Sequence, residues 1–107
     1  MPHGFSPGYA AVIYACDELH FEMPSLRTEY ADDSRLMAVW RSAANAILAM
    51  ASELDVGYSE RDAFLYAVDR CEEMLESVGL PRLGEAVYLH AHPTRVSRPR
   101  AEFRDCA

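Results

Sequence analysis

The apolar positions between Ser34 and Leu54 recur at steps of three and four residues, which is the spacing of one face of an α-helix. This face consists of Leu36, Val39, Trp40, Ala43, Ala44, Ile47, either Met50 or Ala51, and Leu54. The opposite face is small and nearly uncharged, and comprises Ala38, Ser42, Asn45, Ala46, Ala49 and Ser52. A fully solvated face normally carries charged residues, so the pattern indicates a helix that is covered on both sides, for instance in a dimer.

The segment from Tyr9 to Met23 also shows helical spacing, with Pro7 near its start and Pro24 at its end. A strand over 11–16 is the alternative, because Val, Ile and Tyr favour strands, but it would leave no clean alternation. We expect the helix.

A helix-poor run, Ala31-Asp32-Asp33-Ser34, separates these two segments. Asp and Ser accept hydrogen bonds from free N–H groups at a helix start, so we expect a break or kink within 25–33. One long helix from Ser25 is the alternative.

A third helix is predicted after Ser59 and Asp62, which resemble a capping box. Its apolar face consists of Phe64, Ala67, Val68, Cys71, Met74, Leu75 and Val78. Gly79 is placed to adopt the left-handed conformation that ends a helix. The short connection over 55–58 predicts an antiparallel hairpin with the preceding helix.

The pattern weakens after Pro81. Residues 85–92 fit either a strand or a short helix, and we favour the helix. Residues 93–107 have too little apolar content for a core and predict an extended arm. The sequence therefore predicts a mainly α protein, a small three- to four-helix bundle with an antiparallel helix hairpin. We expect an acidic helical domain over 1–92 and a basic Pro/Arg-containing C-terminal arm over 93–107.

The net charge of −7 is unevenly distributed along the chain. Residues 1–79 hold 14 acidic residues against five arginines, whereas residues 80–107 hold three against five. The chain has ten arginines but no lysine or glutamine, which is typical of a GC-rich bacterial or phage genome. The lack of lysine excludes Schiff-base catalysis and a P-loop lysine.

The expected location is the cytoplasm of a bacterial host. Cys16, Cys71 and Cys106 are odd in number and form no CxxC pair, and the N-terminus shows no signal-peptide pattern. No apolar stretch approaches the roughly 18 residues that a membrane span needs.

Acidic side chains follow the polar side of the third predicted helix, and we single out Asp69, Glu72, Glu73 and Glu76. The first predicted helix carries Asp17, Glu18 and Glu22 in a similar way. The simplest interpretation is a solvated amphipathic surface. The alternative is a phosphate-like array, because regularly placed negative charge is what nucleic-acid-binding proteins recognise non-specifically.

Four bulky side chains, Tyr14, Phe21, Leu65 and Tyr66, lie off the predicted core faces. Either the segment over 85–92 packs on them, or they form a protein-binding patch, since aromatic residues ringed by charge are typical interface anchors.

Two arrangements of His and Cys bear on catalysis and metal binding. His90 and His92 form an HxH pair, but no further ligand lies at a diagnostic spacing, so we expect no metal and no cofactor. His20 follows Cys16 by four residues, but Cys16 belongs to the apolar face, where cysteine is usually inert packing. The sequence shows no nucleophile, base and anion-stabilising group at spacings that would form an active site. We therefore do not expect an enzyme.

The tail carries arginines at 95, 98, 100 and 104 around Phe103, and we single out Arg98 and Arg100. One interpretation is an arm that folds onto an acidic partner, RNA, or the acidic body itself. The other is a solubilising terminus.

The leading functional hypothesis is a non-catalytic binding or inhibitor protein of bacterial or phage origin. Its acidic helical face would block a basic, nucleic-acid-binding partner protein, as some phage inhibitors of bacterial defence do. The alternative is an antitoxin-like or regulatory homodimer whose basic C-terminal arm engages a toxin or nucleic acid. Direct nucleic-acid binding is expected only through the tail, because the acidic body repels phosphate.

Overall fold

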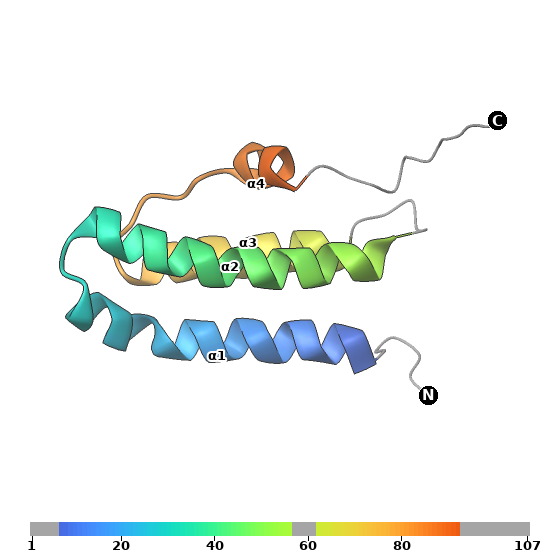
Figure 1. Cartoon of the computed structure of the whole chain (residues 1–107), viewed down its shortest axis with the longest axis horizontal. Coiled ribbons are helices and arrows are strands. Elements are labelled where there is room, and N and C mark those ends of the chain that lie inside the picture. The colour runs from blue at the N-terminus through green and yellow to red at the C-terminus, as the bar shows by residue number, and fades with distance from the viewer. Residues whose placement is uncertain (1–6, 57–61, 93–107) are drawn as a thin grey trace.

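The computed structural model describes residues 7–56 and 62–92, which form helices α1 (Pro7–Glu29), α2 (Asp33–Asp55), α3 (Asp62–Ser77) and α4 (Glu85–Ala91). The three long helices pack against one another, with α2 antiparallel to α1 and α3, and α4 lies on the side of α2 and α3 away from α1 (Figure 1). The mainly α bundle and its helix hairpin are confirmed. The expected arm over 93–107 and the predicted cap at Ser59 lie outside the described residues.

The core is one cluster to which all four helices contribute. Its largest fully buried side chains are Trp40, Phe64, Met23, Leu36, Leu48, Met74, Leu75, Val12, Cys16 and Cys71. Most of these residues belong to the three apolar faces that helical spacing predicted, since side chains three and four residues apart share one side of a helix.

Helix α1 continues through Pro24, and the predicted end at this residue is wrong. Proline removes one backbone donor and usually kinks or breaks a helix, at about 3 kcal/mol. Here Met23 is fully buried and Leu26 packs against the core beyond the proline, so continuing the helix keeps both in apolar contact. The alternative strand over 11–16 is also wrong, because these residues are helical.

The break between α1 and α2 falls at residues 30–32, within the predicted interval, and the alternative of one long helix is wrong. Asp32 caps α2, because its side chain accepts a hydrogen bond from the Arg35 backbone N–H at 3.0 Å. Arg27 holds the corner by binding the Ala31 carbonyl at 2.9 Å and the Asp33 carboxylate at 2.7 Å.

Helix α3 is capped at both ends. The buried Asp55 carboxylate at the end of α2 accepts hydrogen bonds from the N–H groups of Ala63 at 3.2 Å and Phe64 at 2.9 Å. At the other end Gly79 has φ 79°, and the Leu80 N–H donates to the Leu75 carbonyl at 2.9 Å, as in a Schellman motif. The prediction for Gly79 is confirmed.

The segment over 85–92 contains a short helix, as favoured from the sequence. Tyr88 is the buried residue of α4. None of the helices in the described part of the chain is long and apolar enough to cross a membrane.

Candidate functional site

One stripe of exposed side chains runs along α3. Leu65 is 38% exposed, and the Glu73 and Glu76 side chains are 57% and 56% exposed. Asp69 is also exposed and lies four residues from both Leu65 and Glu73, so the four residues share one side of the helix. The solvent side of α3 therefore combines three carboxylates with one large apolar side chain.

A second stripe, on α1, consists of Tyr14, Asp17 and Phe21 at steps of three and four residues. Tyr14 is 65% exposed and Phe21 is 86% exposed, whereas α4 contacts the other side of the bundle. The alternative that residues 85–92 cover these bulky side chains is therefore wrong. The Tyr14 hydroxyl donates to Glu18 on the same helix at 2.8 Å, which adds a further carboxylate beside this stripe.

Arg70 joins the two stripes. Its guanidinium lies 2.8 Å from the Asp17 carboxylate on α1 and 3.6 Å from the Glu73 carboxylate on α3. It also donates to the Tyr66 hydroxyl at 2.7 Å, and the Tyr66 ring lies 6.1 Å from that of Tyr9. Burial alone would lower the pKa of Arg70, but its bonds to Tyr66 and Asp17 outweigh this and raise the pKa.

These contacts define one surface, which we call the α1–α3 acidic face. Its members are Tyr14, Asp17, Phe21, Leu65, Asp69, Glu73 and Glu76, with half-buried Tyr66 and Arg70 in the seam between the helices. Neighbouring helices pack with their axes about 8–10 Å apart, so the two stripes can be touched by a single partner element. Seven of the ten binding residues singled out from the sequence thus lie on or beside one surface.

Glu72 does not belong to this face, and its assignment to the exposed stripe is wrong. Its side chain is only 6% exposed and turns toward α4. The carboxylate accepts hydrogen bonds from the Tyr88 hydroxyl at 2.6 Å, the Leu83 N–H at 3.0 Å and the Gly84 N–H at 3.2 Å. Arg82 adds a contact at 3.4 Å. Glu72 therefore anchors the segment that leads into α4.

The charge of Glu72 is maintained in spite of its burial. Burial alone would raise the pKa of its carboxyl group, but the hydrogen bonds from Tyr88, Leu83 and Gly84 and from Arg82 lower the pKa overall. Burial and the bond to Glu72 raise the pKa of Tyr88, so the phenol stays protonated as the donor. The pair is a charge-assisted hydrogen bond between α3 and α4.

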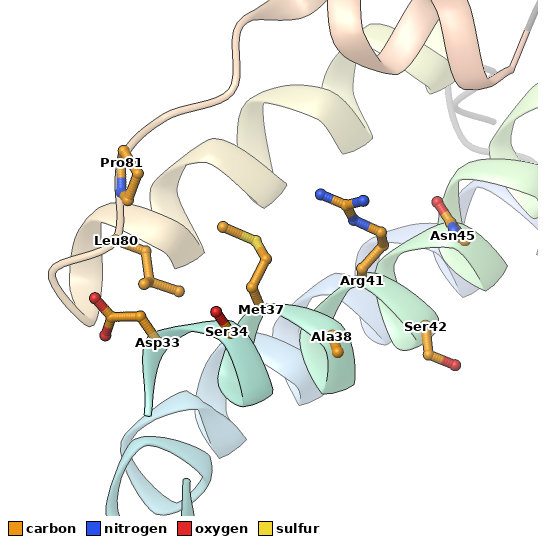
Figure 2. A pocket seen from close by; sticks show the side chains of 9 residues that line it. All are labelled: Asp33, Ser34, Met37, Ala38, Arg41, Ser42, Asn45, Leu80 and Pro81. Carbon is orange, nitrogen blue, oxygen red and sulfur yellow. The ribbon is translucent and has the colours of Figure 1, made fainter. Parts of the chain in front are cut away.

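A groove of about 760 Å³ lies between α2 and the Leu80–Pro81 segment (Figure 2). Met37 and Leu80 supply apolar surface, while Ser34, Asn45 and Arg41 supply polar groups. The groove borders the small-residue face of α2, where Ala38, Ser42, Ala46 and Ala49 are exposed. Within the described residues of the single chain this face is therefore uncovered, so the predicted cover on this side would have to come from elsewhere, such as a second copy of the chain.

The thiols of the described region are buried in the core, whereas its histidines differ in exposure. Cys16 and Cys71 are fully buried, and burial raises their pKa values to about 11 and about 12. The interpretation of Cys16 as packing is confirmed. His92 Nε2 lies 3.2 Å from the Asn45 side-chain oxygen, whereas His90 is exposed. No group of three or more His, Cys, Asp or Glu within 7–56 and 62–92 is arranged to hold a metal ion.

Arg98 and Arg100 lie outside the described residues.

Comparison with protein-family models, curated proteins and solved structures finds no match to this chain.

Proposed function

We propose that this chain is a non-catalytic binding protein of bacterial or phage origin. It would act in the cytoplasm of a bacterial host by blocking the basic, nucleic-acid-binding surface of a partner protein, as a phage inhibitor of bacterial defence would. The observation that carries this proposal is that Arg70 brings the exposed stripes of α1 and α3 together in one face.

The carboxylates of this face support the electrostatic part of the proposal. Glu73 lies four residues from Asp69 and three from Glu76, which places its Cβ atom about 5–6 Å from each of theirs. Asp17 continues the array onto the neighbouring helix. A partner evolved to bind phosphates presents Arg and Lys at comparable density, and these side chains bind carboxylates through the same charge-assisted hydrogen bonds.

The exposed apolar side chains support specificity. Phe21 and Tyr14 stand on either side of Asp17, and Leu65 flanks Asp69. An arginine of the partner can bind a carboxylate while its planar guanidinium stacks on an aromatic ring. Large aromatic residues also bury the most area per residue at protein interfaces, where they act as anchors. The α1–α3 acidic face thus offers both charge and apolar contact.

The proposal is tested by charge reversal in the α1–α3 acidic face. The variant carries Asp69→Lys, Glu73→Lys and Glu76→Lys and leaves Glu72 intact, because Glu72 is structural. The matched control reverses three exposed acids elsewhere, Glu29, Glu53 and Glu85. Tagged proteins are used to capture partners from a bacterial lysate, with circular dichroism as a check of folding.

We expect the face variant to lose the captured partner and the control to retain it, although both change the net charge equally. Equal retention by the two variants would contradict the proposal. Equal loss would show that only total charge matters, which would also remove the α1–α3 acidic face as the binding site.

The antitoxin-like or regulatory dimer is a second candidate, which the exposed small-residue face of α2 favours. Ala38, Ser42 and Ala49 recur at steps of four and seven residues, and small side chains allow two helices to approach closely. Sedimentation of the wild type and of Ala49→Glu tests this candidate. A dimer that dissociates in the variant supports it, and a wild-type monomer at high concentration contradicts it.

A further inference from the structure

A second hollow adjoins the groove on α2 and extends beneath α4. It is a cavity of about 90 Å³ lined by Trp40, Arg41, Ala44, Asn45, Leu48, Leu83, Val87, Tyr88, Ala91 and His92. Arg41 and Asn45 line both the groove and the cavity, so the two hollows meet at these side chains. The groove is open to solvent, and most of the cavity wall is apolar or aromatic.

Arg41 is an exposed cation at this junction, and no carboxylate of the described ranges pairs with it. Its guanidinium makes no hydrogen bond or ion pair with any residue of the described ranges, whereas Arg27, Arg70 and Arg82 all contact carboxylates. Figure 2 shows the Arg41 side chain extending outward from α2 among the residues that line the groove. The acidic residue of the groove, Asp33, already binds Arg27 at 2.7 Å. An anion in the groove would therefore meet a positive charge that no described carboxylate neutralises.

Trp40 supplies a second polar group that lacks a partner in the described structure. Its side chain is 1% exposed and lines the cavity, yet its indole Nε1 has no hydrogen-bond acceptor in the described structure. Buried donors are nearly always paired, because an unpaired N–H loses its bond to water without replacement. A ligand atom that accepts a hydrogen bond from Nε1 would remove that loss.

We propose that the groove and the cavity bind a small aliphatic carboxylate whose chain carries a keto or hydroxyl oxygen. The carboxylate binds the Arg41 guanidinium, the carbon chain lies against Leu48, Leu83 and Val87, and the oxygen accepts from Trp40 Nε1. A cavity of about 90 Å³ has room for a short chain only. This site lies on the α2–α4 side and is independent of the α1–α3 acidic face.

The only tryptophan of the chain makes the proposal directly testable. Levulinate, a five-carbon keto acid, is titrated into the full-length protein, and the Trp40 fluorescence and the single indole N–H resonance are recorded. Valerate lacks the keto oxygen, and methyl propyl ketone lacks the carboxylate. We expect saturable binding of levulinate, with the two analogues about tenfold weaker, because each lacks one polar contact.

Two arginines of α2 give a matched pair of variants. Arg41→Gln removes the cation at the junction, and Arg35→Gln removes an equally charged, exposed arginine that lines neither hollow. We expect levulinate to bind Arg41→Gln about tenfold more weakly and Arg35→Gln as tightly as the wild type. Equal affinities for the two variants would overturn the role of Arg41.

A third variant tests the cavity itself. Ala91 lines the cavity but is exposed, so Ala91→Leu adds volume there without disturbing a buried position. We expect this variant to fold normally and to lose levulinate binding. The proposal is overturned if levulinate produces no saturable change in the wild type at millimolar concentration, if valerate binds as tightly as levulinate, or if Ala91→Leu binds as the wild type does.

Discussion

The Tyr88 hydroxyl donates a hydrogen bond of 2.6 Å to the buried Glu72 carboxylate, which joins α4 to α3. The same carboxylate accepts from two backbone N–H groups of the segment that precedes α4. An acidic residue that the sequence places in a solvated stripe is in fact the attachment point of the last helix.

Removing the Tyr88 hydroxyl tests this attachment. Tyr88→Phe deletes a buried hydrogen bond to a charged group, so we expect a loss of about 1.5–3 kcal/mol in the free energy of unfolding. Tyr14→Phe is the matched control, because its hydroxyl bonds to Glu18 on the surface and should contribute much less to stability. Urea denaturation measures both. Similar losses in the two variants would show that the Glu72–Tyr88 bond contributes no more to stability than a surface hydrogen bond does.

The lowered pKa of Glu72 predicts a pH dependence. Because the unfolded chain takes up the proton at a higher pH than the folded chain, the stabilisation is complete above the ordinary carboxyl pKa of 4.5 and is lost as the pH falls through the lower folded pKa. Below that point we expect α4 to detach and expose Trp40, which lines the cavity beneath it. Trp40 fluorescence during an acid titration measures this.

Glu72→Gln is the control for the acid titration. Its side chain cannot take up a proton in this range, so its Trp40 fluorescence should lack the acid step that the wild type shows. An identical acid step in both proteins would assign the pH dependence to other groups.

The Asp55 carboxylate is expected to stabilise the start of α3. Asp55→Ala removes the acceptor for the Ala63 and Phe64 N–H groups, which should cost about 1–2 kcal/mol in the free energy of unfolding. Glu53→Ala, an exposed change two residues earlier, should alter stability by less than about 0.5 kcal/mol. Thermal unfolding distinguishes them, and equal midpoints would contradict the capping role.

Phe21 should matter for binding but not for folding. Because its side chain is 86% exposed, Phe21→Ala should change the free energy of unfolding by less than about 0.5 kcal/mol. As an interface anchor it should weaken partner binding about tenfold, which corresponds to about 1.4 kcal/mol. Met50→Ala removes another partly exposed apolar side chain, on α2, and should leave binding unchanged. Binding assays with both variants check this, and an unaffected Phe21→Ala would remove α1 from the interface.

The helices could be predicted because their apolar side chains repeat at helical spacing and meet in one core. The end of α1 could not, because Met23 and Leu26 gain enough contact with the core to carry the helix past Pro24. Local sequence rules include the cost of the proline but not the tertiary packing that offsets it.

The candidate site could likewise be predicted only in part. Exposure of Asp69, Glu73, Phe21 and Tyr14 follows from their position on each helix. Glu72 lies at the flank of the apolar face of α3, where its environment depends on what packs beside it. The sequence did not fix the position of α4, so the bond to Tyr88 could not be foreseen. The link from Asp17 through Arg70 also depends on the relative placement of two helices far apart in the chain.

We propose that the α1–α3 acidic face takes the place of nucleic acid on a basic partner. Competition tests this: the partner captured by the tagged wild-type protein is challenged with duplex DNA at low and at physiological salt. We predict that DNA displaces this protein from the partner, because both bind the same cationic surface of the partner. The partner's affinity for this protein should also fall steeply as salt is raised. A partner that stays bound to this protein while it also binds DNA, with little dependence on salt, would contradict the claim.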